Sequence, residues 1–457
     1  MTTLREPSTD EHVRPRAPRT ADATTLIALF VVLQFGLPAT LVLDHLPMAL
    51  RASTIVALGL GVLWFCTQMT TTLGAAKGSN PVRTAVFVYA CVVLAVYGKS
   101  SFTYLDGDER ASGDHAMVIV LSMICLALAI CDGVRSRERI GFLLRVMVVG
   151  ACWVSFVGIV QYLFLFDITG YLQLPGMQFG ERYDLVLVRE GLPRVSGTTQ
   201  HPIEFGVFSA MMLPLALHVA FTETRGRRWR GAWWGCVALI ATGLMFSASR
   251  SAILALACTG IVLSFGWTAR RRLWTVAAGL VFLVFIKLIS PGLLGALVSL
   301  FRNAGNDDSV RYRTHDYDTA REAISANPLL GRGIGTWYSP KRVVFDNQYL
   351  LTLVDSGIIG LAAVLGMVFA AMYCVRRVVV LSRVSPAPVG TTSRDRDLAL
   401  SLGASLAAIL PTYATFDFAA FSTVNSLMYL VVGVSGALLR VVATEVAGDP
   451  VDEHAVG

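Results

Sequence analysis

Arginine residues stand out in three polar segments of a sequence that is otherwise dominated by long apolar stretches. The segments are residues 166–202, the short turn Ser247–Ser251, and a polar island at residues 301–347 that is rich in Arg, Asp, Tyr and Trp. The arginines of interest in them are Arg194, Arg250, Arg311, Arg313 and Arg332. A guanidinium group stays charged and forms paired hydrogen bonds with anionic oxygens, so these residues are candidate ligands for an anion. This pattern favours an enzyme acting at a membrane face over a simple pore.

The composition places the chain in a membrane. It is 54% hydrophobic and only 15% charged, with a mean hydropathy of +0.61, whereas a soluble domain carries about 25% charged residues. Long unbroken apolar runs indicate helices and exclude a barrel. The sequence therefore predicts an all-α polytopic membrane protein with about twelve transmembrane helices and one large outer loop that contains short helices. The predicted spans are 24–44, 53–73, 83–98, 116–132, 140–166, 203–222, 232–248, 251–268, 273–296, 347–374, 397–416 and 422–442.

The distribution of basic residues sets the orientation. If the N-terminal tail is cytoplasmic, every inner loop of the twelve-span topology is basic and the outer loop 99–115 is acidic, as the positive-inside rule requires. The predicted organisation is a disordered cytoplasmic tail (1–23), one transmembrane domain (24–444) with the outer loop 298–346, and a cytoplasmic C-terminal tail (445–457). The location is the inner (plasma) membrane. The net charge of +7 then reflects topology, and the inner arginine clusters lack the interleaved aromatics of a nucleic-acid site.

The sequence does not predict a cofactor or a metal site. All eight cysteines fall in or at the edges of predicted spans, which gives neither a disulfide framework nor a metal-ligand spacing. The glycines at 331, 333 and 335 do not complete a dinucleotide fingerprint and follow no strand.

Arg250 is the most constrained of the outward arginines, because only Ser-Ala-Ser-Arg-Ser separates two apolar runs there. An arginine at full depth in a membrane costs about 2–3 kcal/mol. It is either a helix-end arginine that snorkels to the surface or a fixed anion ligand within the bundle.

Four stretches resemble the bacterial O-antigen ligase and O-antigen polymerase superfamily, whose members are polytopic glycan transferases. Their order, spacing and shared outward side carry the resemblance, which covers about residues 140–375. The stretches are Arg194–Pro202 (RVSGTTQHP), Ser247–Arg250 (SASR), Ser309–Arg313 (SVRYR) followed by Asn327–Gly335 (NPLLGRGIG), and Asp346–Leu350 (DNQYL) followed by Gly357–Gly360 (GIIG).

The resemblance implies transfer of a glycan from an undecaprenyl diphosphate lipid to an acceptor hydroxyl, without a metal. Arg250 and Arg313 match the family's functional arginines and are the expected diphosphate ligands, a role that suits a guanidinium group. Arg311 is a substitute for Arg313, and Arg194 and Arg332 are lesser candidates. Alternatively, Arg332 is a solvated residue of a glycine-rich turn.

The acceptor hydroxyl needs a general base. The ligases are expected to carry a histidine where this sequence has Asp346, so Asp346 is either the base or a helix N-cap. His201 is the rival base, with a boundary or substrate-orienting role as the alternative. Asn347 and Tyr349 either orient the sugar or serve as a helix cap and an interfacial aromatic. His315 is a further substrate-binding candidate or a surface residue of a short amphipathic helix at 316–326.

Asp346 in place of histidine favours the polymerase, in which the acceptor is another lipid-linked glycan. The ligase alternative passes a finished glycan to a different lipid, polymer or protein. A flippase for the same lipid-linked glycan belongs to another class, and the scarcity of ionisable residues within the spans disfavours it. The expected partners are the lipid-linked donor, the glycan or lipid acceptor and membrane lipids, with a separate chain-length regulator left open.

Overall fold

Helices form almost all of the regular structure in this chain. The computed structural model describes residues 22–70, 78–180, 186–189, 192–302, 308–338, 341–384 and 388–447, and 77% of it is helical. A helix satisfies its own backbone hydrogen bonds, so it is the form that apolar sequence of this length adopts in lipid. The chain is thus an all-α polytopic membrane protein.

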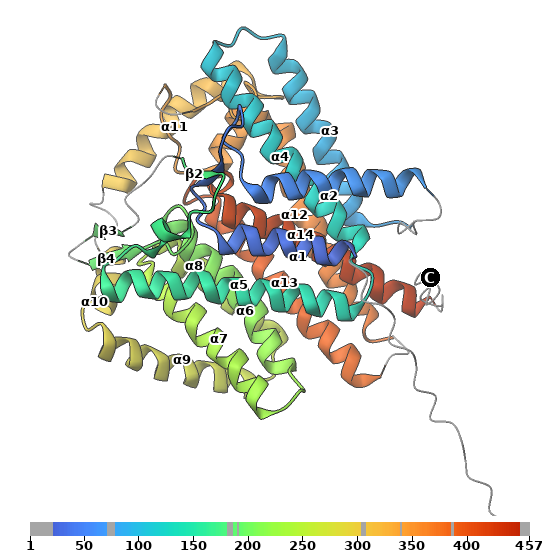
Figure 1. The fold of residues 1–457 in the computed structure, drawn as a ribbon, viewed down its shortest axis with the longest axis vertical. Helices are drawn as coiled ribbons and strands as arrows, with labels where there is room; N and C mark the ends of the chain where they lie inside the picture. The colour runs from blue at the N-terminus through green and yellow to red at the C-terminus, as the bar shows by residue number, and fades with distance from the viewer. Residues whose placement is uncertain are drawn as a thin grey trace, which may run out of the picture.

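Figure 1 shows the helices stacked side by side, with most of the short strands and α10 at one end of the bundle and the C-terminus toward the other. The helices that coincide with predicted spans are α1 (Ala23–Gly36), α2 (Ala52–Met69), α3 (Pro81–Ser101), α4 (Gly107–Gly133), α5 (Arg137–Phe164), α6 (Pro202–Thr222), α7 (Arg227–Phe246), α8 (Arg250–Gly266), α9 (Ala269–Ile289), α12 (Gln348–Leu381), α13 (Val389–Thr412) and α14 (Ser422–Val446). The remaining elements are β1 (Leu41–Leu43), η1 (Ile168–Leu172), β2 (Met177–Phe179), β3 (Val186–Arg189), β4 (Leu192–Val195), α10 (Leu293–Arg302), α11 (Asp308–Ala326) and η3 (Phe418–Ala420).

Each predicted span overlaps at least one helix, but not every helix is long and apolar enough to cross a membrane by itself. Eight helices meet that criterion among the described residues, namely α2, α3, α4, α5, α6, α9, α12 and α14. Helices α1 and α8 are apolar but shorter, with 14 and 17 residues. The polytopic class is confirmed, and the count of twelve stays a prediction.

In two of the predicted spans the helix ends well before the predicted boundary because a proline follows. The span predicted at 24–44 ends at Gly36, just before Pro38, and the chain continues into β1, which pairs with β2 in antiparallel fashion. The span predicted at 273–296 ends at Ile289, just before Pro291, and a new helix, α10, follows. Proline has no N–H to donate to the preceding turn and its ring disfavours helix continuation.

Helices α6 and α14 form the buried centre of the bundle. Helix α14 packs against α4, α12 and α13, and α6 packs against α7, α8 and α13. Helix α9 is the opposite case, because nearly all of its side chains are exposed. The centre therefore brings together helices from the middle and the end of the sequence.

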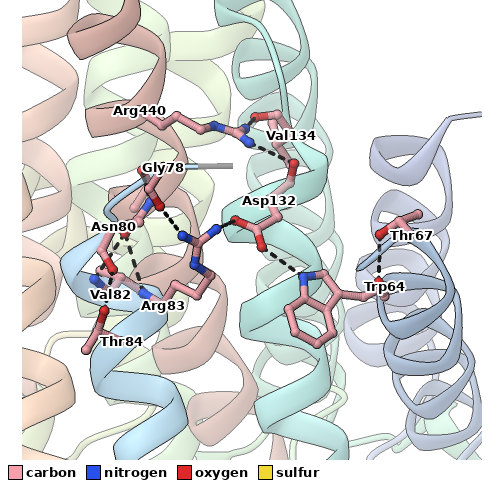
Figure 2. Close-up of polar contacts among 11 residues, drawn as sticks. Trp64, Thr67, Gly78, Asn80, Val82, Arg83, Thr84, Asp132, Val134 and Arg440 are labelled. Carbon is pink, nitrogen blue, oxygen red and sulfur yellow. Dashed lines mark hydrogen bonds and ion pairs between the residues drawn. The ribbon is translucent and has the colours of Figure 1, made fainter. Parts of the chain in front are cut away.

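Ion pairs join the helices at the end of the bundle remote from the short strands. In Figure 2 the carboxylate of Asp132, at the end of α4, accepts from Trp64 Nε1 of α2 at 2.9 Å and from Arg83 Nη1 of α3 at 3.3 Å. Arg440 of α14 donates to the carbonyl oxygens of Asp132 at 2.8 Å and of Val134. One acidic residue thus connects three helices, while arginine from a fourth closes the end of α4.

Removing the Asp132 carboxylate is expected to destabilise the bundle. Asp132 is only 3% exposed, and Asp132→Ala leaves the Trp64 and Arg83 donors without their acceptor, a loss of about 3 kcal/mol or more for a buried pair. Thermal unfolding in detergent measures this effect. Asp132→Asn retains an acceptor oxygen for Trp64 and is expected to lose less. Equal unfolding temperatures for wild type and Asp132→Ala would contradict the network's role.

Helix α12 is broken at Gly357, and the C-terminal part of the polar island fills the break. Gly357 has φ 67°, and the backbone N–H groups of Ile358 and Ile359 donate to the carbonyls of Pro328 and Leu329 at 2.9 and 3.2 Å. In return, the carbonyls of Val354 and Asp355 accept from the N–H groups of Arg332 and Gly333 at 2.8 and 2.9 Å. We call this interlocked pair, residues 327–337 with 354–359, the glycine clamp.

The two glycines at the centre of the glycine clamp, Gly331 and Gly357, have no room for a side chain. A Cβ atom on Gly357 would lie 2.3 Å from the carbonyl carbon of Leu329, and one on Gly331 would lie 2.3 Å from that of Asp355. Both glycines have positive φ, 67° and 63°, a region that side chains disfavour. The two glycine-containing stretches of the sequence are therefore two halves of one contact that holds the island against α12.

Candidate active site

The first turns of α6, α12 and α14 meet at the end of the bundle that carries the short strands. Glu204, in the first turn of α6, accepts from the backbone N–H groups of Thr423 and Val424 in α14 at 2.6 and 3.3 Å. Gln348, the first residue of α12, accepts from the N–H of Ala419 in η3 at 2.7 Å. Helix N-termini carry partial positive charge and N–H donors, so their convergence favours an anion.

Arg194 and the turn before α8 lie against the start of α6. Arg194, on β4, is 8% exposed and its Nε donates to the carbonyl oxygen of Ser247 at 3.3 Å. A Cβ on Gly206 of α6 would lie 2.4 Å from Ser247 Oγ, so the turn and α6 are in close contact. Arg250, the first residue of α8, follows three residues after Ser247 and is half-buried. The sequence motifs around Arg194 and Arg250 are therefore neighbours in space.

His201 caps α6 and is a poor base. Its Nδ1 accepts from the N–H of Ile203 at 3.2 Å, and its ring centroid lies 5.8 Å from that of Phe421. Burial, followed by the nearby positive charge of Arg194, lowers the pKa of His201 to about 4. The imidazole is thus neutral at pH 7, and because Nδ1 accepts a hydrogen bond, the ring proton is on Nε2. This geometry fits a hydrogen-bond donor to substrate better than a general base.

The site also contains the carboxyl groups of Glu204, Asp346 and Asp417. Of these three, only Asp346 was predicted from the sequence. Burial, followed by repulsion from Asp346 and Glu204, raises the pKa of Asp417 to about 7. Asp417 precedes η3, in the connection between α13 and α14, and it is not among the site residues predicted from the sequence. Its only signal was an acidic residue flanked by Phe416 and Phe418, both of which are buried.

The N-cap of α12 is Asn347, so the N-cap alternative for Asp346 is wrong. Asn347 Oδ1 accepts from the N–H groups of Tyr349 and Leu350 at 3.0 and 3.3 Å. Tyr349 donates its hydroxyl proton to the carbonyl oxygen of Leu410 at 2.7 Å and so joins α12 to α13. Both side chains therefore make structural contacts. For Asn347 this is the helix cap that was one of its two predicted roles.

Arg332 pairs with Glu109, an acidic residue in the first turn of α4. Its Nη2 donates to both carboxylate oxygens of Glu109 at 2.8 and 2.9 Å, and Arg342 Nη2 donates to Glu109 Oε1 at 3.1 Å. Lys341 pairs with Asp106. The alternative of a solvated Arg332 is wrong, and the acidic character of the 99–115 segment is explained in part by its contact with the basic residues of the island.

Helix α11 carries Arg311, Arg313 and His315 in its first two turns, and their side chains lie outside the described residues. The predicted amphipathic helix at 316–326 is confirmed, although it begins earlier, at Asp308. Ala320 is fully buried with Phe345 and Val354, next to the start of α12. This apolar contact docks α11 beside Asp346.

The fold and this arrangement define a polytopic membrane protein with a cationic and acidic site where several helices begin. Residues 235–365 match the family model described as O-antigen ligase, and this match supports the O-antigen ligase and polymerase superfamily. The matched segment runs from α7 to the first half of α12 and includes Arg250, α11, the glycine clamp and Asp346. It does not include Arg194, His201 or Asp417. No curated protein matches the chain.

Proposed function

We propose that this protein polymerises glycans at the outer face of the cell membrane, by moving an oligosaccharide from a lipid diphosphate to a hydroxyl of a second lipid-linked glycan. The family match supports glycan transfer of the O-antigen ligase or polymerase type in general. The observation that carries the finer proposal is the contact of Arg194 with the Ser247–Arg250 turn, near His201 at the start of α6. Glu204, in the first turn of the same helix, lies close enough to Asp417 to repel its charge. An anion site and a proton acceptor are the two parts that this reaction requires.

In the proposed reaction the acceptor oxygen attacks the anomeric carbon of the donor sugar, and the bond from that carbon to the diphosphate oxygen breaks. Arg250 and Arg313 are the proposed ligands of the departing lipid diphosphate, with Arg194 and Arg311 beside them. The acceptor proton passes to Asp417 or Asp346. A carboxyl group with a pKa of about 7 is a stronger base than an ordinary aspartate, whose pKa is about 4. His201 Nε2 is placed to donate to a substrate oxygen.

The proposed orientation puts the helix starts of α2, α6, α12 and α14 on the outer face and both termini in the cytoplasm. The basic segments 135–139 and 225–230, at the starts of α5 and α7, support this orientation. The glycine clamp supports the placement of the 327–337 segment of the island on the same face as the site.

Purified protein in vesicles with a synthetic lipid-diphosphate oligosaccharide tests the proposal. The expected result is release of lipid diphosphate together with growth of the glycan chain. Arg250→Ala and Arg313→Ala are each expected to lower kcat/KM by about 100-fold or more, the loss typical of a lost ligand for developing charge. Arg321→Ala, on the exposed side of α11, is the matched control and is expected to turn over like wild type.

Different outcomes separate the alternatives. Transfer only to a different lipid, polymer or protein would identify a ligase. Movement of the lipid-linked glycan between leaflets without bond formation would identify a transporter. Unchanged turnover in both Arg250→Ala and Arg313→Ala would show that the assigned diphosphate ligands are wrong.

A further inference from the structure

A polymerase of lipid-linked glycans has to bind two diphosphate groups, and this inference rests on the proposed function. The diphosphate of the donor leaves at the reacting carbon. The diphosphate of the acceptor stays intact and is separated from the attacking hydroxyl by the sugars of its repeat unit. A second cationic site is therefore expected on the same face as the first, set apart from the reacting groups.

A pocket at the junction of α1 and α2 has the properties of such a site. It is a small hollow that opens to the surface, and Gln34, Arg51 and Ser53 are the polar residues of a lining that is otherwise apolar. Arg51 occupies the N-cap position of the 18-residue helix α2, and its side chain makes no capping hydrogen bond. The half-buried Arg51 and the first two residues of α2, Ala52 and Ser53, thus border the same hollow at a helix N-terminus.

Hydrogen bonds connect this pocket to the start of α14, where the acidic residues of the candidate site lie. Ser53 donates to Gln34 Oε1 at 2.6 Å, and Gln34 Nε2 donates to Ser422 Oγ at 3.3 Å. The next residue, Thr423, donates its N–H to Glu204. The pocket is therefore connected through α1 and the start of α14 to Glu204.

The charge of Arg51 is incompletely balanced. Burial lowers the pKa of Arg51 to about 10, and attraction to Glu204 offsets part of this effect. Glu204 itself already accepts three backbone N–H groups, from Gln200, Thr423 and Val424. Within the ranges that the structure describes, no hydrogen bond or ion pair holds the Arg51 guanidinium group. An arginine in this state is suited to an external anion.

We propose that Arg51 and the first turn of α2 bind the diphosphate group of the acceptor lipid. The Arg194–Arg250 side then serves the donor, and the acidic residues of the candidate site receive the acceptor hydroxyl. The headgroup of an ordinary anionic phospholipid offers the same phosphate chemistry, so the experiment has to separate these two sources.

The test compares two acceptors in vesicles of neutral lipid, with the same lipid-diphosphate donor. One acceptor is the lipid-diphosphate oligosaccharide, and the other is the same oligosaccharide with a free reducing end. Arg51→Ala is expected to raise KM for the lipid-diphosphate acceptor by about tenfold or more, the effect of losing a charge-assisted hydrogen bond. The rate with the phosphate-free acceptor and KM for the donor are expected to stay within about twofold of wild type. Arg51→Lys is expected to restore part of the loss.

Arg110→Ala, an exposed arginine in the first turn of α4, is the control for a general loss of positive charge. Equal losses with both acceptors, or a raised KM for the donor, would overturn the assignment of Arg51 to the acceptor. An effect that appears only when the vesicles contain anionic phospholipid would assign the pocket to that lipid and also overturn the proposal. If the wild type transfers nothing to either acceptor, the proposed function itself fails, and this result is distinct from all outcomes for Arg51.

Discussion

Gly357→Ala is expected to abolish glycan transfer and to destabilise the protein by about 2–5 kcal/mol. A positive φ costs a residue with a side chain about 1–2 kcal/mol, and overpacking costs about 1–3 kcal/mol more. The new methyl group would lie 2.3 Å from the backbone of Leu329, so the 327–337 segment would have to leave its place against α12. Thermal unfolding and transfer assays on the same preparation measure both effects.

Gly366→Ala is the matched control on the same helix. A Cβ at Gly366 meets nothing within 4 Å, and alanine in a helix interior is favoured over glycine by about 0.5–1 kcal/mol. This variant is expected to unfold at the same temperature as wild type or slightly above it and to remain active. An active Gly357→Ala variant with wild-type stability would mean that the glycine clamp does not form. Gly331→Ala, which meets the backbone of Asp355, should resemble Gly357→Ala because it disrupts the other half of the same contact.

Asp417→Asn is expected to lower kcat by about 100-fold or more and to remove the pH dependence of transfer near neutrality. General base catalysis contributes about 10²–10⁴-fold. Because the pKa of Asp417 is raised to about 7, the wild-type rate should rise as the pH increases through about 7, where the carboxyl group loses its proton. The Asn variant cannot gain that charge, so its residual rate should be nearly flat over the same range. Asp108→Asn, an exposed acid in the first turn of α4, is the control and should keep the wild-type profile.

The raised pKa of Asp417 makes stability fall with increasing pH, whereas activity is expected to rise. The folded state holds the Asp417 proton more tightly than the unfolded chain, so the free energy of unfolding falls as the pH rises from about 4 to about 7. Asp417→Asn should therefore be at least as stable as wild type at pH 8, although it is nearly inactive. A variant that loses activity and stability together at pH 8 would indicate a structural role and contradict the assignment as base.

Local signals in the sequence account for the helices and for most of their ends. Helix starts are marked by the prolines at positions 81 and 202 and by the capping side chain of Asn80, all of which are visible in the local sequence. The errors at Pro38 and Pro291 arose where an apolar run continued past a proline, and there the backbone constraint decided the helix end.

Only some of the residues that meet in the site could be predicted from local sequence signals. Arg194, Arg250 and His201 were selected by type and position, and the tertiary structure brings them to the start of α6. Asp417 was overlooked because nothing in a Phe-Asp-Phe stretch shows that two other carboxyl groups, Glu204 and Asp346, approach it from distant helices. Asn347 and Asp346 were adjacent candidates for one cap, and only the backbone geometry assigns it to Asn347.

The sequence by itself determined that this protein is a bundle of membrane helices with its arginine-rich segments apart from the apolar runs, because hydropathy, charge and proline act over a few residues. Tertiary structure alone decided that the two glycine stretches interlock, that Arg332 binds Glu109, and that the helix starts carrying Glu204, Asn347 and Ser422 converge. These contacts join residues that are tens to hundreds of positions apart in the chain. Their energies depend on burial and on distance between side chains, and packing of the whole bundle sets both.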